Sequence, residues 1–400
     1  MQLNNLSARK LFLHRHALSG LPPAQAKGAD LAALITQLGF VQLDSIATVE
    51  RAHHMILFAR RPAYRPPALD RLLKHDRAIF EHWTHDASVI PVQFFPHWRL
   101  KMARDADRLA KQWKLWQRHG VDEKSDAVLA QITNHGPVCS SDVRDDPARK
   151  GDGWWDWHPA KTALEYQWRC GILSVTHRHN FQKHYDLTER VIPPQYRDHT
   201  PDPDQTIDWA CNAALDRLGF ATTGELAAFW DIITPAEARK WAAAQQKTGA
   251  LAAVEIENAD GSTRTHLARP DIIESARNAP DPTGRIRVLS PFDPALRDRK
   301  RAERLFNFQY RIEVFTPAPK RKYGYYVFPL IEGANLIGRI DMKAHRDQST
   351  LRITAVWPEQ GVKFGKLRQK RLDSELARMA RFAGCDRVEY LDGWLRDPAL

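Results

Sequence analysis

Two stretches of the chain repeat one order of predicted elements. In the first, apolar residues at helical spacing predict helices over residues 125–134 and 159–170, with a short helix from Asp142 between them. Alternating residues then predict a hairpin over residues 172–187. Helix, turn, helix, helix, hairpin is the order of elements in a winged helix.

The second stretch shows this order again without obvious sequence identity to the first. Helices are predicted over residues 208–218 and 235–247, and Thr222 or Thr223 can cap a helix between them. An Asp-Gly pair then predicts a hairpin over residues 254–268, because both residues tolerate positive φ. The sequence therefore predicts two tandem winged helices within an α+β chain.

Pro-rich polar stretches at residues 191–207 and 276–284 are typical of connectors. The amino-terminal part predicts amphipathic helices over residues 7–17 and 30–37, and a third winged helix there would lack a visible wing hairpin. The carboxyl-terminal part ends in a predicted helix over residues 364–382. Strands are predicted before it over residues 285–289, 310–315, 325–331, 336–342 and 351–356. The predicted domains are residues 1–120, 121–200, 206–280 and 284–400.

Composition narrows the class of protein. The 400 residues include 59 Lys and Arg against 48 Asp and Glu, a net charge of +11, and four cysteines without a C-x-x-C pair. A membrane span needs about 18 consecutive apolar residues, and no such run or signal-peptide pattern is present, so we expect a cytoplasmic protein. The positive charge favours a polyanionic partner such as nucleic acid.

The triplet Gln42-Leu43-Asp44 is the strongest candidate for chemistry. It lies in an alternating segment, residues 40–44, that predicts a short strand. In a strand Gln42 and Asp44 share one face while Leu43 faces the core. An amide and a carboxylate side by side can hold one water and face a developing positive charge. The alternative is that Asp44 caps a helix that begins at Ser45.

Two basic and aromatic clusters are candidates for contacts with phosphates. One follows the triplet, and the other belongs to residues 285–352, which carry 15 Lys and Arg against 7 Asp and Glu. The alternative for the second is a solvated basic turn beside a core strand. The residues predicted to contact DNA are Arg51, His53, His54, Arg60, Tyr64, Arg311, Lys320, Arg321, Lys322, Tyr323, Arg339 and Lys343.

No metal or organic cofactor is predicted. His53 and His54 are adjacent, which is poor spacing for two ligands of one metal, so a DNA contact or a buried hydrogen-bonding role is favoured for them. The hairpin histidines His177, His179 and His184 are not accompanied by an evident carboxylate or cysteine cluster. Phosphate-loop, dinucleotide-binding, zinc-protease and serine-hydrolase motifs are absent from the sequence.

Several motifs, in order, resemble the crosslink-repair DNA glycosylases of the YcaQ/AlkZ type. The motifs cover nearly the whole chain. They are residues 41–60, Phe80-Glu81-His82-Trp83 with His85 and Pro91, residues 153–157, residues 185–193, Ser290-Pro291-Phe292-Asp293 with Asp298-Arg299, residues 320–326 and residues 338–343.

The resemblance implies tandem winged helices plus a β-rich carboxyl region, arranged as a concave DNA-binding channel. It implies excision of N7-alkylated purines from double-stranded DNA, including bulky adducts and interstrand crosslinks, without a cofactor or an obligate protein partner. The family's catalytic triplet is Gln-apolar-Gln in one branch and Gln-apolar-Asp in the other, so Gln42 and Asp44 place this chain with the YcaQ-like branch, associated with broader lesion tolerance.

The resemblance further implies that Asp44 stabilises the sugar cation and polarises a water, while Gln42 orients that water or the lesion. A crosslinked base cannot flip out freely, so an inserted loop or hairpin is expected, with residues 320–326 and the wing at Arg178 as candidates. No lysine nucleophile is identifiable, which favours a monofunctional enzyme that leaves an abasic site. We expect it to act on nucleoid DNA.

The competing class is a non-catalytic winged-helix transcriptional regulator, because tandem winged helices and a basic balance would look the same. A regulator has no evident use for Gln42 and Asp44 on one face beside a basic cluster. An RNA-processing or toxin-like protein has no supporting motif.

Overall fold

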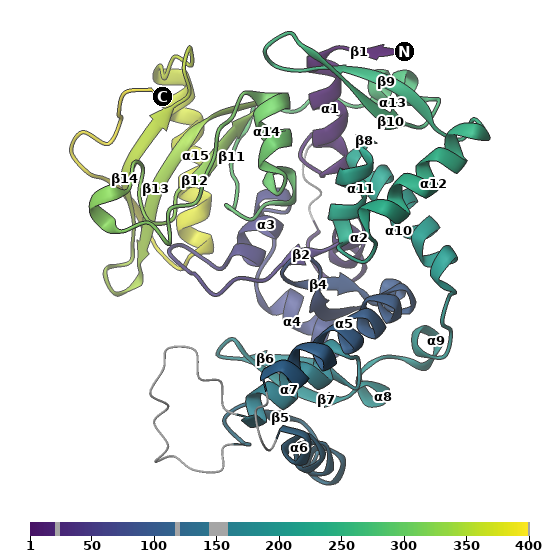
Figure 1. The fold of residues 1–400 in the computed structure, drawn as a ribbon. Helices are drawn as coiled ribbons and strands as arrows, with labels where there is room; N and C mark the ends of the chain where they lie inside the picture. Colours follow the sequence, from purple (N-terminus) through teal and green to yellow (C-terminus); the bar gives the residue numbers. More distant parts are fainter. Residues whose placement is uncertain (21–24, 117–120, 144–158, 399–400) are drawn as a thin grey trace. The chain divides into compact units, whose positions relative to one another are not determined.

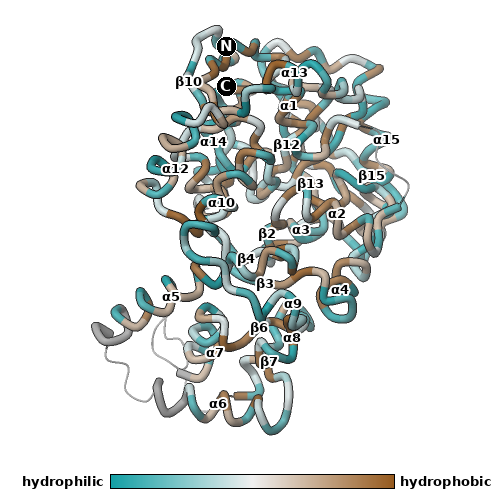
Figure 2. Tube along the Cα trace, turned by 90° about the vertical axis from the view of Figure 1, so that its right-hand side faces the viewer, coloured by the Kyte–Doolittle hydropathy of each residue, from teal (hydrophilic) through white to brown (hydrophobic). Residues whose placement is uncertain are grey.

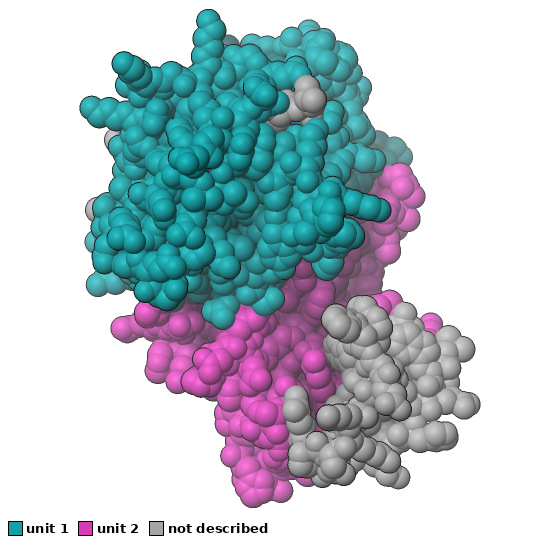
Figure 3. Space-filling model, turned by 90° about the vertical axis from the view of Figure 1, so that its left-hand side faces the viewer, with its two compact units in different colours: residues 1–66, 213–225, 242–400 teal, residues 67–212, 226–241 magenta. Residues whose placement is uncertain are grey.

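The structure is a computed structural model that describes residues 1–20, 25–116, 121–143 and 159–398. It contains two compact units (Figure 3). Unit 1 consists of Met1–Pro66, Ala213–Glu225 and Ala242–Leu400, and unit 2 of Pro67–Asn212 and Leu226–Trp241. Both units mix helices and strands, so the α+β class is confirmed. Each unit joins stretches that are distant in the sequence, and the division into four domains stays a prediction.

Unit 1 contains two sheets built largely from the second half of the chain (Figure 1). Its helices are α1 Asn5–Arg15, α2 Gly28–Leu38, α3 Ala52–Arg60, α13 Ile272–Asn278, α14 Arg299–Phe306 and α15 Lys366–Phe382. Its strands are β1 Gln2–Leu3, β2 Val41–Gln42, β8 Phe220–Ala221, β9 Ala252–Glu257, β10 Thr263–Ala268, β11 Ile286–Val288, β12 Phe328–Glu332, β13 Asn335–His345, β14 Thr350–Pro358 and β15 Arg387–Tyr390. Short 3-10 turns are η2 Pro294–Leu296, η3 Ala318–Lys320 and η4 Arg346–Gln348.

The larger sheet of unit 1 has the strand order β11-β12-β13-β14-β15. Strands β12, β13 and β14 pair antiparallel, and β15 pairs parallel with β14. Helix α15 packs against this sheet through buried residues such as Leu372, Leu376 and Met379 (Figure 1). The smaller sheet has the order β1-β9-β10-β8, in which the second residue of the chain pairs with Glu255.

Unit 2 is dominated by helices. Its elements are α4 Pro67–Lys74, β3 Ile79–Trp83, β4 Ala87–Pro91, η1 Val92–Phe94, α5 Phe95–Trp116, α6 Val121–His135, β5 Val138–Cys139, α7 Pro159–Arg169, β6 Leu173–His179, β7 Gln182–Leu187, α8 Thr188–Val191 and α9 Pro194–Arg197. Strands β5, β7 and β6 form a small sheet, and α6 and α7 pack over a core that includes Ile132, Leu164 and Trp168. Helices α10 Pro203–Leu218, α11 Thr223–Trp230 and α12 Pro235–Lys247 contribute residues to both units.

The repeated order of elements is confirmed where the chain is described. In the second repeat, Thr222 and Glu225 form a capping box that starts α11, since the Glu225 carboxylate accepts the Thr222 N–H at 2.7 Å. In the first repeat, Asn180 and Phe181 both have positive φ and form the two-residue turn between β6 and β7. The helix predicted from Asp142 has only its first two residues, 142 and 143, among the described residues, and the motif at residues 153–157 lies outside them.

One strand prediction is wrong, and two others are confirmed with different bounds. Residues 310–315 form a loop instead of a strand, because side chains rather than a ladder of backbone hydrogen bonds hold them: the Tyr310 hydroxyl donates to the Val327 carbonyl at 2.6 Å. The strand predicted over residues 325–331 begins only at Phe328. The predicted strand over residues 40–44 ends at Gln42.

One hairpin was not predicted from the sequence. Strands β3 and β4 pair antiparallel, although no wing was visible in the amino-terminal part. Glu81 and His82 interrupt the alternation of polar and apolar residues, yet both are buried at 1% exposure. Their burial is an outcome of tertiary hydrogen bonding, which a hydrophobicity pattern does not record.

Among the described residues, no helix combines the length and apolarity that a membrane crossing requires. Figure 2 shows hydrophobic and hydrophilic residues alternating along the helices instead of forming long apolar segments. This alternation is the pattern of helices with one face in a protein core.

Candidate functional site

The Gln42-Leu43-Asp44 triplet lies in unit 1, where β2 gives way to a loop. Gln42 is 5% exposed and Leu43 is 7% exposed, while Asp44 is half-buried. Asp44 Oδ1 accepts the N–H of Ile46 at 2.8 Å, which is a local Asx turn. The alternative that Asp44 caps a helix at Ser45 is wrong, since the next described helix begins at Ala52. The turn instead fixes the orientation of the carboxylate.

Asp44 lies in the electrostatic environment of Tyr326. Burial raises the pKa of the Tyr326 hydroxyl, and the negative charge of Asp44 raises this pKa further, while the nearby Ser290 hydroxyl opposes the shift. The Phe292 ring lies 6.2 Å from the Tyr326 ring between centroids. Three motifs therefore converge here: the Gln-Leu-Asp triplet, and, more than 240 positions later in the sequence, Ser290-Pro291-Phe292-Asp293 and residues 320–326.

One backbone and one side-chain hydrogen bond attach the loop after Asp44 to β13 of the larger sheet and the turn that follows it. The Ala344 N–H of β13 donates to the Thr48 carbonyl at 2.8 Å, and the Arg346 guanidinium donates to the Val49 carbonyl at 2.6 Å. Lys343, predicted to contact DNA, is exposed next to Ala344. The sheet thus positions the triplet loop and a surface cation together.

A second carboxylate, which the sequence analysis assigned no role, lies on the same strand. Burial raises the pKa of Asp341 to about 6. Gly324 has φ +145°, and a Cβ built there would stand 2.9 Å from Asp341 Oδ2. A side chain at residue 324 would therefore require a strained backbone and a shift of the Asp341 side chain.

A cationic loop, residues 311–326, precedes Tyr326. The Glu313 carboxylate accepts the N–H groups of three consecutive residues, 322 to 324, at 2.8, 2.8 and 3.0 Å. Burial opposes ionisation of Glu313, but these N–H donors hold its pKa below the ordinary value. Arg321 Nε also donates to the Thr316 carbonyl at 2.8 Å. The loop is therefore held in shape by its own side chains.

The outer surface of this loop combines cations with aromatic rings. Arg311, Lys320 and Lys322 are exposed, and Phe315 is 96% exposed. The Arg321 guanidinium lies 5.0 Å from the centre of the Tyr325 ring, and Lys322 Nζ lies 5.2 Å from that of Tyr323. Sequence reasoning missed Phe315, because exposure cannot be read from a residue type. DNA contact by the cations of this loop and by Tyr323 stays a prediction.

Three of the predicted DNA contacts are interior side chains, which corrects those predictions. Arg60 is 1% exposed and donates to both oxygens of Asp293, at 2.7 and 2.9 Å. Tyr64 is fully buried. Arg339 donates to Glu359 at 2.7 Å and lies against the Phe308 and Tyr323 rings. Each has its polar atoms committed inside unit 1, where a phosphate has no access.

The adjacent histidines His53 and His54 are likewise internal. Of the two roles predicted for them, the structure favours buried hydrogen bonding over contact with DNA. His53 and His54 are 4% and 7% exposed, and their ring centroids lie 4.1 Å apart. His54 Nδ1 and the Tyr64 hydroxyl are hydrogen-bonded at 2.8 Å. Burial and the charge of Arg51 lower the pKa of His54 to about 3, so its ring is neutral at pH 7. Arg51 itself is half-buried at the start of α3, and its DNA contact stays a prediction.

The wing of unit 2, hairpin β6–β7, is the other candidate for insertion into DNA. Its arginine, Arg178, forms an ion pair within the protein. Arg178 donates to both carboxylate oxygens of Glu81, at 2.6 and 2.8 Å, and lies over the Phe181 ring. Its side chain is 15% exposed. This arrangement favours a structural role for Arg178.

The structure corrects the expectation that no cysteine or carboxylate accompanies the hairpin histidines. Cys139, Asp142 and His184 bring potential ligand atoms within 4.8 Å of one another. Two of these groups already have protein partners, since Asp142 Oδ2 accepts the Cys139 N–H at 2.8 Å and the Cys139 sulfur lies 2.8 Å from the Ser141 hydroxyl. Such bonds are those of a capping turn.

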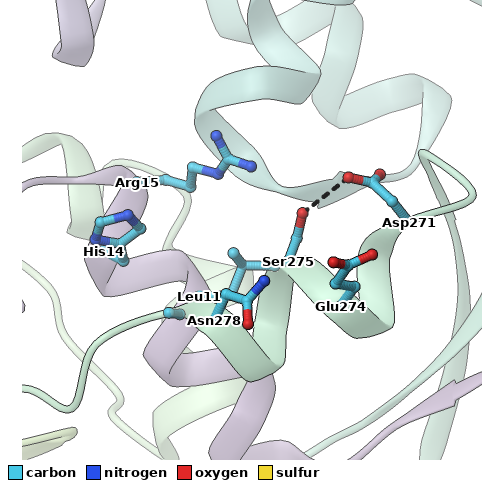
Figure 4. Close-up of a pocket in the computed structure, with 8 residues that line it drawn as sticks. Leu11, His14, Arg15, Asp271, Glu274, Ser275 and Asn278 are labelled. Carbon is cyan, nitrogen blue, oxygen red and sulfur yellow. Dashed lines mark hydrogen bonds between the residues drawn. The ribbon is translucent and has the colours of Figure 1, made fainter.

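A polar hollow of about 310 Å³ lies between α1 and α13 in unit 1 (Figure 4). It is lined by Leu11, His14, Arg15, Asp271, Glu274, Ser275, Asn278 and Ala279. The Ser275 hydroxyl donates to Asp271 at 3.1 Å within it. None of the predicted site residues borders this hollow.

The α+β fold, an oriented carboxylate beside a buried tyrosine, and a cationic loop leading into the same place are features of enzymes that act on nucleic acids. The comparisons with known proteins identify the class more closely. A family model described as DNA glycosylase AlkZ-like matches residues 35–382. The chain therefore belongs to the AlkZ-like DNA glycosylase family and is a DNA glycosylase, an enzyme of DNA repair.

Among solved structures, the chain is similar to the Streptomyces sahachiroi DNA glycosylase AlkZ. The two are 16% identical with a TM-score of 0.64, and the match covers 99% of this chain and 100% of the other. At this level of identity the likeness supports the fold. The family membership decides between the enzyme and the non-catalytic regulator in favour of the enzyme.

Proposed function

We propose that the enzyme is a monofunctional glycosylase that hydrolyses the N-glycosidic bond of N7-alkylated purines in double-stranded DNA and leaves an abasic site. Bulky adducts and interstrand crosslinks are included in the proposed range. The observation that carries this proposal is the half-buried Asp44 carboxylate, oriented by the Ile46 N–H and set beside Tyr326. Because the proposed substrate is DNA, the proposal includes action on nucleoid DNA.

The proposed chemistry follows from the charge of the lesion. An N7-alkylated purine is already cationic, so it departs with the electrons of the C1′–N bond as a neutral base and needs little acid assistance. The sugar is left with positive charge, which a fixed carboxylate stabilises more strongly than mobile water does. Asp44 then accepts a proton from the water whose oxygen bonds to C1′. Gln42 orients this water or the lesion.

We further propose that residues 311–326 form the loop that meets the duplex. Its cations are exposed, it ends at Tyr326 beside Asp44, and Glu313 holds it in shape. Phe315, at 96% exposure, has the character of an apolar wedge that enters between base steps, where unstacking costs a few kcal/mol. Such a wedge gives a carboxylate access to the sugar without complete flipping of the base.

The test uses a duplex that contains one N7-methylguanine, incubated with the full-length protein in EDTA and then treated with alkali. We expect strand scission by the wild type, and a loss of about 10²-fold in the single-turnover rate for Asp44→Asn with DNA affinity nearly unchanged. Equal rates for both proteins would remove Asp44 from the mechanism. Absence of scission on this duplex and on a nitrogen-mustard crosslink would refute the proposed substrate class.

A further inference from the structure

Tyr326 carries a buried hydroxyl that the protein leaves without a hydrogen bond. The residue is 1% exposed, and among the described residues its Oη has no partner with hydrogen-bonding geometry. Leaving a buried hydroxyl unsatisfied costs about 1–3 kcal/mol. Such a group in a native fold calls for an explanation, and a ligand or a reactant water at an active site is one.

The neighbouring tyrosine shows that this sheet can satisfy such groups. Tyr310 is 2% exposed, and its hydroxyl donates to the Val327 carbonyl at 2.6 Å. Tyr64 of the same unit bonds His54. The unsatisfied state of Tyr326 is therefore particular to its position in the fold.

At that position the Tyr326 hydroxyl is within the electrostatic influence of the Asp44 carboxylate, the group that the proposed mechanism uses. Tyr326 lies two residues before Phe328, the first residue of β12, which pairs with Ile340 of β13, and Ala344 belongs to the same strand β13. The Ala344 N–H bonds Thr48, four residues after Asp44. The Ser290 hydroxyl lies near the Tyr326 hydroxyl and opposes the rise of its pKa, but the two do not meet in hydrogen-bonding geometry. The Ser290 oxygen accepts the Phe292 N–H at 3.2 Å.

We propose that Tyr326 is a further catalytic residue, whose hydroxyl donates a hydrogen bond to the water that Asp44 activates. This inference rests on the proposed glycosylase reaction. The water oxygen forms its bond to C1′ as the C1′–N bond breaks, the electron pair leaves with the base, and the water proton passes to Asp44. Tyr326 keeps its own proton throughout, in line with its strongly raised pKa.

The experiment compares Tyr326→Phe with the matched control Tyr310→Phe. Both changes remove one hydroxyl from a buried ring near the same sheet. For Tyr326→Phe we expect a roughly 10- to 100-fold loss in the single-turnover rate on the N7-methylguanine duplex, with DNA affinity unchanged. Its Tm should stay equal or rise, because the hydroxyl removed was unsatisfied. Tyr310→Phe should lower the Tm and keep the rate.

A second measurement tests whether the two groups share one water. If they do, the rate loss of Asp44→Asn combined with Tyr326→Phe falls short of the product of the single losses. A double variant whose rate loss equals the product of the two single losses would overturn the idea that both groups bind one water. A wild-type rate for Tyr326→Phe, or a rate loss accompanied by a Tm loss like that of the control, would overturn the catalytic role. An inactive wild type would instead refute the proposed function on which this inference rests.

Discussion

The loop of residues 311–326 and the hairpin β6–β7 have similar compositions, since both combine cations with aromatic rings. They differ in how deeply the cations are buried. In the hairpin, Arg178 pairs with Glu81 and Lys183 pairs with Glu165 at 2.7 Å, and each cation has a side chain that is 15% exposed. In the loop, Lys320 and Lys322 are exposed. The comparison teaches that burial, rather than the number of cations, distinguishes structural cations from those on a surface suited to phosphates.

The largest expected effect is on the hairpin side of the comparison. Glu81→Ala would leave Arg178 without its buried partner, so we expect the free energy of unfolding to fall by about 3 kcal/mol. Urea denaturation measures this change. A loss below about 1 kcal/mol would mean that the pair is replaceable and that Arg178 can turn to another partner.

On the loop side, the double change Lys320→Ala and Lys322→Ala should weaken binding to undamaged duplex DNA about tenfold with the Tm unchanged. The slope of log K against log salt should become shallower by about 2, since each phosphate contact contributes about 0.9. Fluorescence anisotropy across a salt series gives both values. Lys183→Ala is the matched control, expected to lower the Tm and leave DNA affinity intact, and the reverse result would invalidate the comparison.

A smaller effect is expected at the apolar tip of the loop. Phe315→Ala should slow excision from duplex DNA by about 3- to 10-fold and leave excision from single strands unchanged, because only the duplex requires unstacking. Leu367→Ala on α15 provides the control, since Leu367 is also an exposed apolar residue, at 65%. Equal slowing on single strands would exclude a wedge.

The smallest effect concerns pH and Asp341. Its folded pKa of about 6 exceeds the ordinary value of 3.8, so the folded state resists ionisation of this group. Below about pH 4 Asp341 is protonated in both states and does not reduce the free energy of unfolding. This free energy falls as the pH rises from about 4 to about 6. Asp341→Asn should raise the Tm at pH 8 by a few degrees and leave it unchanged at pH 4. Thermal melts at both values test this, and an equal shift at both would assign the effect to packing instead.

Much of the local structure was predictable because local interactions produce it. Helix α12, Pro235–Lys247, has the predicted bounds, since Thr234 and Glu237 form a capping box three residues apart. The hairpins around Asn180 and Gly261 follow from residues that tolerate positive φ. The loop at residues 310–315 was mistaken for a strand because its apolar residues alternate, while Glu313 captures backbone donors ten residues away.

The sequence by itself determined the α+β class, the capped helices and hairpins, and the Gln42-Leu43-Asp44 triplet with its family resemblance, because these depend on neighbouring residues and their order. Only the tertiary structure decided which polar groups are committed and which are exposed. Arg60 pairs with Asp293, which lies 233 positions away in the sequence. The charge of Asp44 likewise raises the pKa of Tyr326, which is also far away in the sequence. Burial and ion pairing depend on distances in space, and the packing of the sheets sets those distances.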